Sequence, residues 1–223
     1  MIRRRIAAAA LSLATAFLTY AYAQSEEQSQ HSQHHSFENA QKWAHVFDDP
    51  SRDAWQKPDE IVRALALAPN ASVADIGAGT GYLSARLARA VPQGQVYAAD
   101  LEPDMVQHLR MRAMHEGLAN MIAVQAKADD ANLPAKVDLA IMVDVYHHID
   151  NRERYFAKLR ASLKPNGRLA IVDFRRDSPV GPPVSGRIAP EEVKAELARA
   201  GYVPAEEHGF LPYQYFLVFK AAK

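Results

Sequence analysis

The stretch VADIGAGTGY, residues 73–82, decides the fold of this chain. It reads as a short apolar strand, a glycine-rich turn and the start of a helix. The glycines, Gly77, Gly79 and Gly81, allow the backbone to turn sharply and to approach a ligand where a Cβ atom would collide. The helix that follows points free N–H groups and the positive end of its dipole at the same place, which suits a carboxylate or a phosphate. The stretch therefore predicts a ligand site at the end of a strand.

An acidic residue further along the chain supports this interpretation. Asp100 lies 23 residues after Gly77, just past the second expected strand. An acid about 20 residues beyond such a turn is where a ribose diol is held. The alternative is that Asp100 only caps the next helix. A dinucleotide site requires G-x-G-x-x-G, with the third glycine where this chain has Tyr82. The spacing here, G-x-G-x-G, fits an amino-acid tail better than a bridging pyrophosphate.

Strands and helices alternate around this turn. Strands are expected over residues 72–76, 95–99, 121–125, 137–143 and 168–174, and helices over 58–67, 82–90, 103–116, 151–163 and 190–200. This alternation predicts an α/β fold with a Rossmann-like, doubly wound, mostly parallel sheet. Two closing strands, near 203–210 and 213–220, are expected to place an antiparallel strand at its edge. Asp150 and Glu153 form a capping-box pattern at the start of the fourth of these helices.

Four segments in this order resemble the motifs of a known family. They are GAGTGY (77–82), YAADLEPDM (97–105), DLAIMVDVYHHID (138–150) and LKPNGRLAIVDF (163–174). They resemble the successive motifs of class I S-adenosylmethionine-dependent methyltransferases. Within that family they most resemble the small-molecule group that includes quinone and phosphoethanolamine methyltransferases. The resemblance implies a seven-stranded sheet and S-adenosylmethionine as the cofactor.

The resemblance also implies a set of cofactor contacts. The glycine turn would hold the methionine part and Asp100 the ribose, while Leu101 would lie against the adenine. In this group an acid after the third strand reaches the adenine amine. Here that acid is Asp129 or Asp130, and the segment AKADDANLP leaves the choice open. The remaining expected cofactor contacts are Asp75, Tyr82 and Gln56.

The catalytic candidates follow the fourth strand. Methyl transfer from a sulfonium is an in-line displacement in which the enzyme mainly aligns the reactants, and a general base helps when the acceptor must lose a proton. Asp144 is a candidate for positioning the cofactor's amino group and offsetting the sulfonium charge. His148 matches the catalytic histidine of phosphoethanolamine-type enzymes and is the first candidate base, and His147 is the second. For each histidine the alternative is a packing role, and two adjacent histidines without a third ligand do not indicate a metal site.

Two further segments are expected to shape the site. Residues 37–57 directly precede the core, where related enzymes place a lid over the cofactor, and Gln56 is a candidate closing residue. After the fifth strand, Arg175, Arg176 and Arg187 are candidates for binding an anionic acceptor. The alternative for these arginines is a solvated run of charges.

The N-terminal residues predict export. Arginines at positions 3–5 precede an apolar run over residues 6–18, and Ala21-Tyr22-Ala23 has the form of a cleavage site. We expect a signal peptide over residues 1–23, cut after Ala23, and a periplasmic or secreted protein without stable membrane insertion. The alternative is an uncleaved membrane anchor. Residues 24–36 are polar and of low complexity, which predicts a disordered leader before a methyltransferase domain over 37–223.

Composition restricts the partners. The 223 residues suit one domain with a tail. Without residues 1–23 the chain has 23 basic and 26 acidic side chains, which argues against the broad basic surface that nucleic-acid binding requires. Because there is no cysteine, disulfides and a thiolate nucleophile are excluded.

The sequence therefore predicts a methyltransferase that acts on a small-molecule acceptor, and it gives no sign of an oligomeric state. Three other functions compete with this prediction. They are an exported cofactor-binding or sensor protein without methyl transfer, a nucleic-acid methyltransferase, and a nucleotide-dependent oxidoreductase. The fourth strand is followed by Asp144-Val145-Tyr146, which lacks the paired prolines that are typical of amino-methylating nucleic-acid enzymes.

Overall fold

The computed structural model of the chain describes residues 39–222, so the predicted signal and leader lie outside the described residues. The strands are β1 (Ser72–Ile76), β2 (Gln95–Asp100), β3 (Met121–Gln125), β4 (Val137–Val143), β5 (Leu163–Phe174), β6 (Tyr202–His208) and β7 (Gln214–Ala221). The α-helices are α2 (Ala40–Phe47), α3 (Asp53–Gln56), α4 (Pro58–Ala64), α5 (Ser84–Ala90), α6 (Pro103–His115), α7 (Arg152–Arg160) and α8 (Pro190–Arg199). Short 3₁₀ turns are η1 (Pro50–Arg52), η2 (Tyr146–His148) and η3 (Val184–Gly186).

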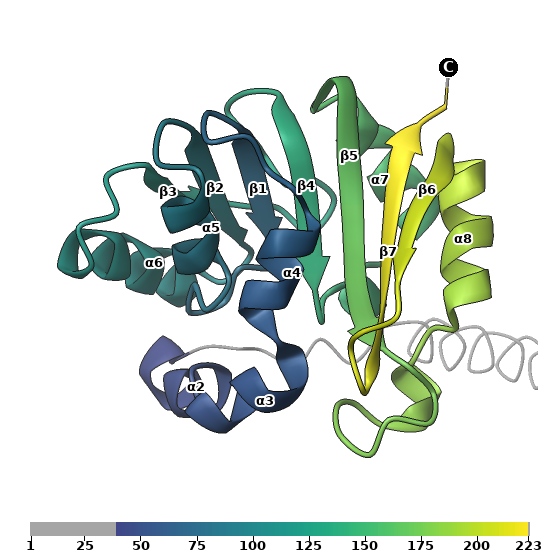
Figure 1. The fold of residues 1–223 in the computed structure, drawn as a ribbon, viewed down its shortest axis with the longest axis horizontal. Helices are drawn as coiled ribbons and strands as arrows, with labels where there is room; N and C mark the ends of the chain where they lie inside the picture. Colours follow the sequence, from purple (N-terminus) through teal and green to yellow (C-terminus); the bar gives the residue numbers. More distant parts are fainter. Residues whose placement is uncertain (1–38, 223) are drawn as a thin grey trace, which may run out of the picture. The chain divides into compact units, whose positions relative to one another are not determined.

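The strands form one seven-stranded sheet in the order β3-β2-β1-β4-β5-β7-β6 (Figure 1). The pairs from β3 through to β5 are all parallel. Strand β7 runs antiparallel to both β5 and the edge strand β6. The predicted doubly wound, mostly parallel sheet with an antiparallel strand near its edge is confirmed. The chain winds outward from β1 to β3 and then returns to β4, so the switch point where such folds bind ligands lies between β1 and β4.

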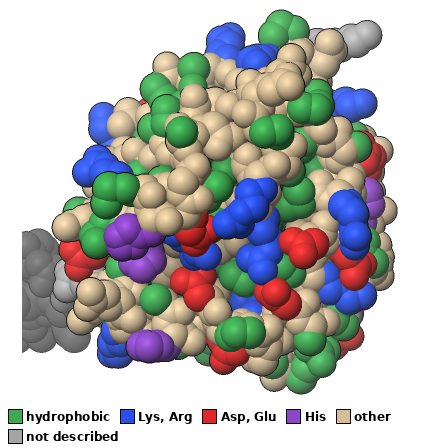
Figure 2. Space-filling view, turned by 60° about the vertical axis from the view of Figure 1, so that its left-hand side comes forward, with side chains coloured by type: hydrophobic (Ala, Val, Ile, Leu, Met, Phe, Trp, Pro, Cys, Tyr) green, Lys and Arg blue, Asp and Glu red, His purple; other side chains and the backbone are tan. Residues whose placement is uncertain are grey.

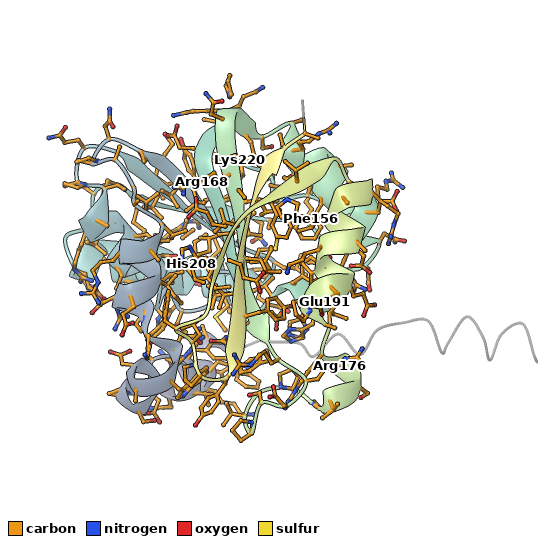
Figure 3. The ribbon with its side chains drawn as sticks, turned by 45° about the vertical axis from the view of Figure 1, so that its right-hand side comes forward. Phe156, Arg168, Arg176, Glu191, His208 and Lys220 are labelled. Atoms are coloured by element: carbon orange, nitrogen blue, oxygen red, sulfur yellow. The ribbon has the colours of Figure 1, made fainter. Side chains whose placement is uncertain are left out.

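Helices cover both faces of the sheet, because alternate residues of each strand point to opposite faces and both sets are apolar. On one face, α4, α5 and α6 bury Ile61, Leu87 and Leu109 against the sheet. On the other, α7 and α8 bury Phe156 and Leu197. Figure 3 shows Phe156 between the sheet and its covering helices. These two apolar layers hold the strands rigidly and fix the positions of the loops at their ends.

One expected strand was too short. Strand β5 begins at Leu163 rather than at residue 168, and the extra residues are accommodated by a register shift against β4 between Val137 and Leu139. Helix α7 begins after Asn151, which adopts a left-handed conformation with φ of 45°, one that asparagine tolerates better than most residues. Glu153 in its first turn pairs with Arg199 at 3.1 Å, and the capping box at Asp150 stays a prediction.

The segment that precedes the core, here called the lid (residues 39–56), lies beyond the carboxyl ends of the parallel strands. Figure 1 shows α2 and α3 below the arrowheads of β1 and β4. The loop from β5 to α8 reaches the same end of the sheet, where Figure 3 places Arg176. Within residues 39–222 no helix combines the length and apolar character needed to cross a bilayer.

Candidate functional site

The glycine turn between β1 and α5 has a backbone that only glycine adopts easily. Gly77, Gly79 and Gly81 have φ values of 71°, 55° and 87°. A Cβ atom on Gly77 would lie 2.8 Å from Cγ1 of Val145 and nearer still to its Cγ2, and one on Gly81 would lie 2.8 Å from Leu109. Both the backbone conformation and the available space therefore require glycine.

The amides of this turn are used within the protein. The N–H groups of Gly77 and Ala78 donate to the Ala99 carbonyl at 2.8 and 3.0 Å. The N–H of Gly79 donates to Oδ2 of Asp100 at 2.7 Å. The free N–H groups that the sequence predicted at this turn are thus partly occupied. The turn can therefore contact a ligand mainly through its close backbone approach and less through hydrogen bonds from these N–H groups.

Asp100 lies where the sequence predicted, at the end of β2 and against the turn. It is 8% exposed, and its Oδ1 accepts from the Glu102 N–H at 2.9 Å. Burial raises the pKa of Asp100, and the hydrogen bonds from Glu102 and Gly79 oppose that shift. Each carboxylate oxygen has a second lone pair, so the group can still accept from the hydroxyls of a ribose. Leu101 follows it and is 44% exposed.

Asp75 supports the turn from behind. Its Oδ2 accepts a hydrogen bond of 2.6 Å from the Ser84 hydroxyl at the start of α5, and the residue is 3% exposed. Burial raises the pKa of Asp75 to about 6, although the bond from Ser84 lowers it. The side chain joins β1 to α5 and so fixes the turn between them, and its contact with the cofactor stays a prediction.

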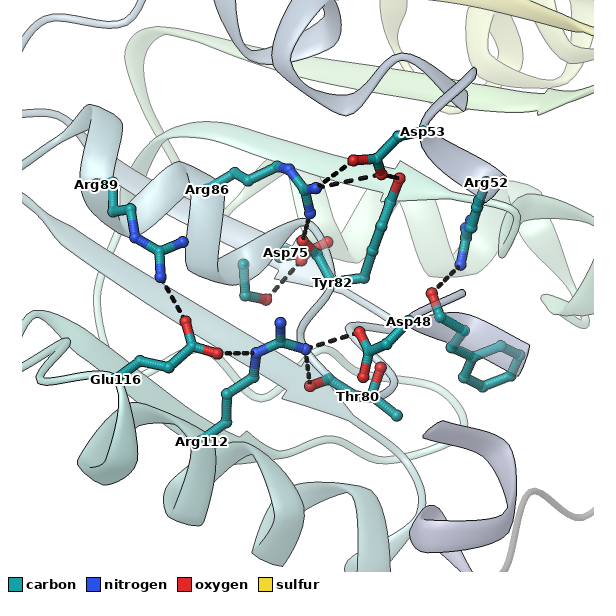
Figure 4. Close-up of polar contacts among 12 residues, drawn as sticks. Asp48, Arg52, Asp53, Asp75, Thr80, Tyr82, Arg86, Arg89, Arg112 and Glu116 are labelled. Carbon is teal, nitrogen blue, oxygen red and sulfur yellow. Dashed lines mark hydrogen bonds and ion pairs between the residues drawn. The ribbon is translucent and has the colours of Figure 1, made fainter. Parts of the chain in front are cut away.

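Ion pairs fasten the lid onto the turn and its helix (Figure 4). Asp48 accepts from Arg112 of α6 at 2.8 Å. Asp53 pairs with Arg86 of α5 at 3.0 Å and accepts a short hydrogen bond from the Tyr82 hydroxyl. The lid's own contacts therefore occupy the side chain of Tyr82. A surface hollow of about 660 Å³ is lined by Arg86 and Arg112 themselves, and residues of the glycine turn do not line it.

A buried polar network continues the lid contacts to the end of β4. Arg52 of the lid donates to Oδ2 of Asp144 at 3.1 Å and to Oε1 of Gln56 at 3.0 Å. Gln56 donates to Gln214 at 2.8 Å, and Gln214 donates back to Asp144. Asp144 has a positive φ of 61°, which turns the chain away from the sheet. Burial raises the pKa of Asp144 to about 7, with Arg52 opposing the shift and the negative Asp173 adding to it.

His147 has a carboxylate partner. Its Nδ1 lies 2.9 Å from both carboxylate oxygens of Asp173, and its backbone N–H donates to the same group at 3.2 Å. Burial disfavours the charged imidazole, but the hydrogen bond to Asp173 and the charges of Asp173 and Asp144 outweigh it and raise the pKa of His147. The ring of His148 lies 4.1 Å away, centroid to centroid. Among the described residues no group of three metal-ligating side chains forms here or elsewhere.

The residues around the turn fit S-adenosylmethionine. The three glycines keep the turn free of side chains where Val145 and Leu109 pack closely against it, and Oγ1 of Thr80 in the turn is buried without a hydrogen-bond partner in residues 39–222. Asp100 and Asp144 place carboxylates on either side, which suits a ligand with sugar hydroxyls and a cationic centre.

Comparison with known proteins agrees with this chemistry. Residues 73–167 match a family described as a methyltransferase domain. The chain is 34% identical over 107 residues to the ubiquinone/menaquinone biosynthesis C-methyltransferase of Pseudomonas putida, covering 47% of this chain and 42% of that protein. It is 34% identical over 100 residues to the malonyl-(acyl-carrier protein) O-methyltransferase of Hahella chejuensis, covering 44% and 34%. The chain spans less than half the length of these curated relatives.

Solved structures share the fold. An S-adenosylmethionine-dependent methyltransferase from Aquifex aeolicus superposes with a TM-score of 0.76 at 24% identity, over 82% of this chain and 99% of that one. Magnesium protoporphyrin IX methyltransferase from Synechocystis, with bound S-adenosylmethionine, gives 0.58 at 21% identity, over 84% and 86%. Residues 73–167 thus match a methyltransferase domain, and the fold is that of S-adenosylmethionine-dependent methyltransferases.

The two acids after β3 contact a lysine of α7. Asp129 and Asp130 approach the Lys158 ammonium of α7 at 3.3 and 2.9 Å. Asp130 also accepts from the Asn132 N–H at 2.8 Å. Their role at the adenine stays a prediction, and Gln125, which donates to the Leu101 carbonyl at 2.6 Å, is a further polar side chain on that side.

Two of the three arginines that are candidates for binding an anionic acceptor donate to backbone carbonyls of loops. Arg187 is 7% exposed, and its guanidinium donates to five backbone carbonyls of the β5–α8 loop, the shortest of these bonds being 2.6 Å to Ser178. Arg175 likewise donates to carbonyls just before β7, including Leu211 at 3.2 Å. These guanidiniums hold loops together. Arg176 lies 3.8 Å from Glu192.

Sequence reasoning missed three residues of the methyltransferase's site. Arg52 and Gln214 reach Asp144 from distant parts of the chain, and no local pattern marks either. Asp173 had a signal that was not used, because it stands at the carboxyl end of the fifth strand, the edge at which such folds bind ligands.

Proposed function

We propose that the protein transfers the methyl group of S-adenosylmethionine to a small-molecule acceptor. The observation that carries the proposal is the bond between the Asp100 carboxylate and the Gly79 N–H, 2.7 Å long, at the carboxyl ends of β1 and β2. It fixes a sugar-binding acid beside a turn without side chains. An acid and a turn in this arrangement suit a ligand that joins an amino-acid tail to a nucleoside.

When bound, the cofactor supplies an electrophilic methyl group. The residues of this chain would bind and orient it. Asp100 would accept from the ribose, the glycine turn would contact the methionine part, and Asp144 would offset the cationic centre. The lid, held by Arg52 on Asp144, would exclude water from the reacting atoms, which strengthens each of these electrostatic contacts.

Two features favour a small-molecule acceptor. One curated relative is named for ubiquinone and menaquinone biosynthesis and another for malonyl-(acyl-carrier protein). Figure 2 shows basic and acidic side chains interleaved on one face of the molecule, rather than a continuous basic surface. A nucleic acid requires many phosphate contacts from such a basic surface.

A methyl-label assay tests the proposal. The purified full chain is incubated with S-adenosylmethionine carrying a labelled methyl group and with a panel of phenols, enols, amines and carboxylic acids. We expect label in at least one acceptor, with the signal strongly reduced in Asp100→Ala. Release of labelled methyl to no member of the panel, together with no binding of S-adenosylmethionine, would contradict the proposal.

We also propose that residues 1–23 direct export and are removed. The three arginines, the apolar run and the small residues at 21–23 support this. Mass spectrometry of the protein recovered from the producing cells should give an N-terminus at Gln24. Recovery of the intact chain from the membrane fraction would favour the uncleaved anchor instead.

A further inference from the structure

The side chains of Asp173 and His147 form a pair that the cofactor site does not use. Asp173 is the next-to-last residue of β5 and is 2% exposed. Its two oxygens lie 2.9 Å from Nδ1 of His147 and also accept the N–H groups of Phe174, at 2.7 Å, and of His147, at 3.2 Å. The carboxylate is therefore held from three directions, and it holds the imidazole in turn. Of the two ring nitrogens, only Nε2 has no hydrogen-bond partner within residues 39–222.

We infer that His147 is the acid–base residue of the acceptor side and that Asp173 is its positioning residue. This inference rests on the proposed methyl transfer and assigns the proton step within it. A carboxylate on Nδ1 keeps the proton at that nitrogen, which leaves Nε2 as a lone-pair acceptor directed elsewhere. His147 is well placed for this role, because η2 (Tyr146–His148) follows β4 at the ligand-binding end of the sheet. Asp144 also lies close enough to favour the charged form of His147.

The proton balance defines the acceptor class. The acceptor's hydroxyl oxygen forms a bond to the methyl carbon while the methyl–sulfur bond breaks and its electron pair stays on sulfur. The hydroxyl proton passes to Nε2 and leaves later to solvent. An imidazole removes a proton more effectively from a phenol or an enol than from an alkyl alcohol, because the pKa of a phenol or an enol is nearer to that of the imidazole. The acceptor is therefore one with an ionisable hydroxyl.

The geometry favours His147 over its neighbour. The titratable groups that face His147 are the carboxyls of Asp173 and Asp144 and the imidazole of His148. Arg52 pairs with Asp144 and reduces the influence of that carboxyl. Asp173 is bonded to His147 directly, so removing its charge should act on the His147 imidazole before any other group.

A pH profile separates positioning from a merely structural role. Asp173→Asn keeps the side-chain size and an oxygen that can accept from Nδ1, but it removes the charge. Since that charge favours protonated His147, its loss should lower the pKa of His147. The base works when it is unprotonated, so the acid limb of kcat/KM should move to lower pH. Asp177→Asn is the matched control: its side chain is 83% exposed, and its limb should coincide with wild type.

Nuclear magnetic resonance gives a readout that needs no acceptor. The imidazole signals of His147 in the labelled full chain are identified by their loss in His147→Gln. In wild type they should titrate above the ordinary histidine value of about 6.5, and in Asp173→Asn at a lower pH than in wild type. Titration of wild-type His147 at or below 6.5 would overturn the inference, even if Asp173→Asn fails to fold.

Turnover completes the test with the best acceptor of the methyl-label panel. His147→Gln should lower kcat by about 10²–10⁴-fold and leave S-adenosylmethionine binding nearly unchanged. Wild-type turnover in His147→Gln would remove this residue from the mechanism while the proposed function stands. A wild-type protein that neither binds S-adenosylmethionine nor transfers methyl would instead end the proposed function itself.

Discussion

Replacement of Gly77 by alanine tests the shape of the cofactor turn. The residue has φ of 71°, and a left-handed conformation costs a residue with a Cβ about 1–2 kcal/mol. The new Cβ would also lie 2.8 Å from Cγ1 of Val145 and closer to Cγ2. Overpacking of this kind costs about 1–3 kcal/mol. Gly77→Ala should therefore lower the free energy of unfolding by about 2–5 kcal/mol, a large part of the 5–15 kcal/mol of a typical domain.

Gly117→Ala is the matched control for the backbone. Gly117 has φ of 64°, and a Cβ there would meet no atom within 4 Å. Gly117→Ala should lower the free energy of unfolding only by the cost of the left-handed backbone, about 1–2 kcal/mol. The difference between the two variants, from urea unfolding of the full chain, measures the collision with Val145. Adding Val145→Ala to Gly77→Ala should recover that difference, as an interaction term in a double-mutant cycle.

The outcome has a functional side as well. The same collision should displace Val145 or the turn, so S-adenosylmethionine should bind Gly77→Ala more weakly than Gly117→Ala by calorimetry. Equal stability and equal affinity in the two variants would refute the reasoning, because the turn would then tolerate a side chain at its tightest point.

Three further predictions concern buried polar groups. Burial raises the pKa of Asp75 from 3.8 to about 6 in the folded protein. The folded protein therefore loses stability as the pH rises from 3.8 through 6, because the buried carboxyl must then ionise. Asp75→Asn should thus add up to about 3 kcal/mol at pH 8 and nothing at pH 3 in urea unfolding, and equal effects at both would contradict this. The Tyr215 hydroxyl is buried without a hydrogen-bond partner in the described residues, so Tyr215→Phe should be neutral or stabilising by about 1 kcal/mol; a loss larger than that would reveal a partner. A lysine has three donors and cannot bond to all five carbonyls that Arg187 contacts. Arg187→Lys should therefore lower the free energy of unfolding by about 3 kcal/mol and speed proteolysis between residues 175 and 189. Unchanged cleavage would argue against the loop-holding role.

Local pattern was sufficient for the sheet. The bounds expected for β1, β3 and β4 are those of the structure, because buried parallel strands are short, continuously apolar and bounded by turns. The position of Asp100 followed from the glycine turn, since both lie at the ends of adjacent parallel strands. The start of α7 shows the limit of this local reasoning, because the left-handed conformation of Asn151 just before the helix was not predicted.

The contacts of the site that join distant segments were not predictable in this way. Arg52 and Asp144 are 92 residues apart in the chain, and His147 and Asp173 are 26 apart. Such pairs arise from the order in which strands add to the sheet, and no periodicity in the sequence records that order. For Arg187, the sequence left an anion-binding residue and a solvated charge as alternatives, whereas the loop folds its own carbonyls around the guanidinium.

Calorimetry of the purified full chain with S-adenosylmethionine tests the central claim most directly. We expect saturable binding that Asp100→Ala weakens by about 1–3 kcal/mol and that Asp177→Ala, a change at an exposed carboxyl, leaves unchanged. No heat with S-adenosylmethionine together with saturable binding of NADH would contradict the account, because the turn and its acid would then serve a dinucleotide.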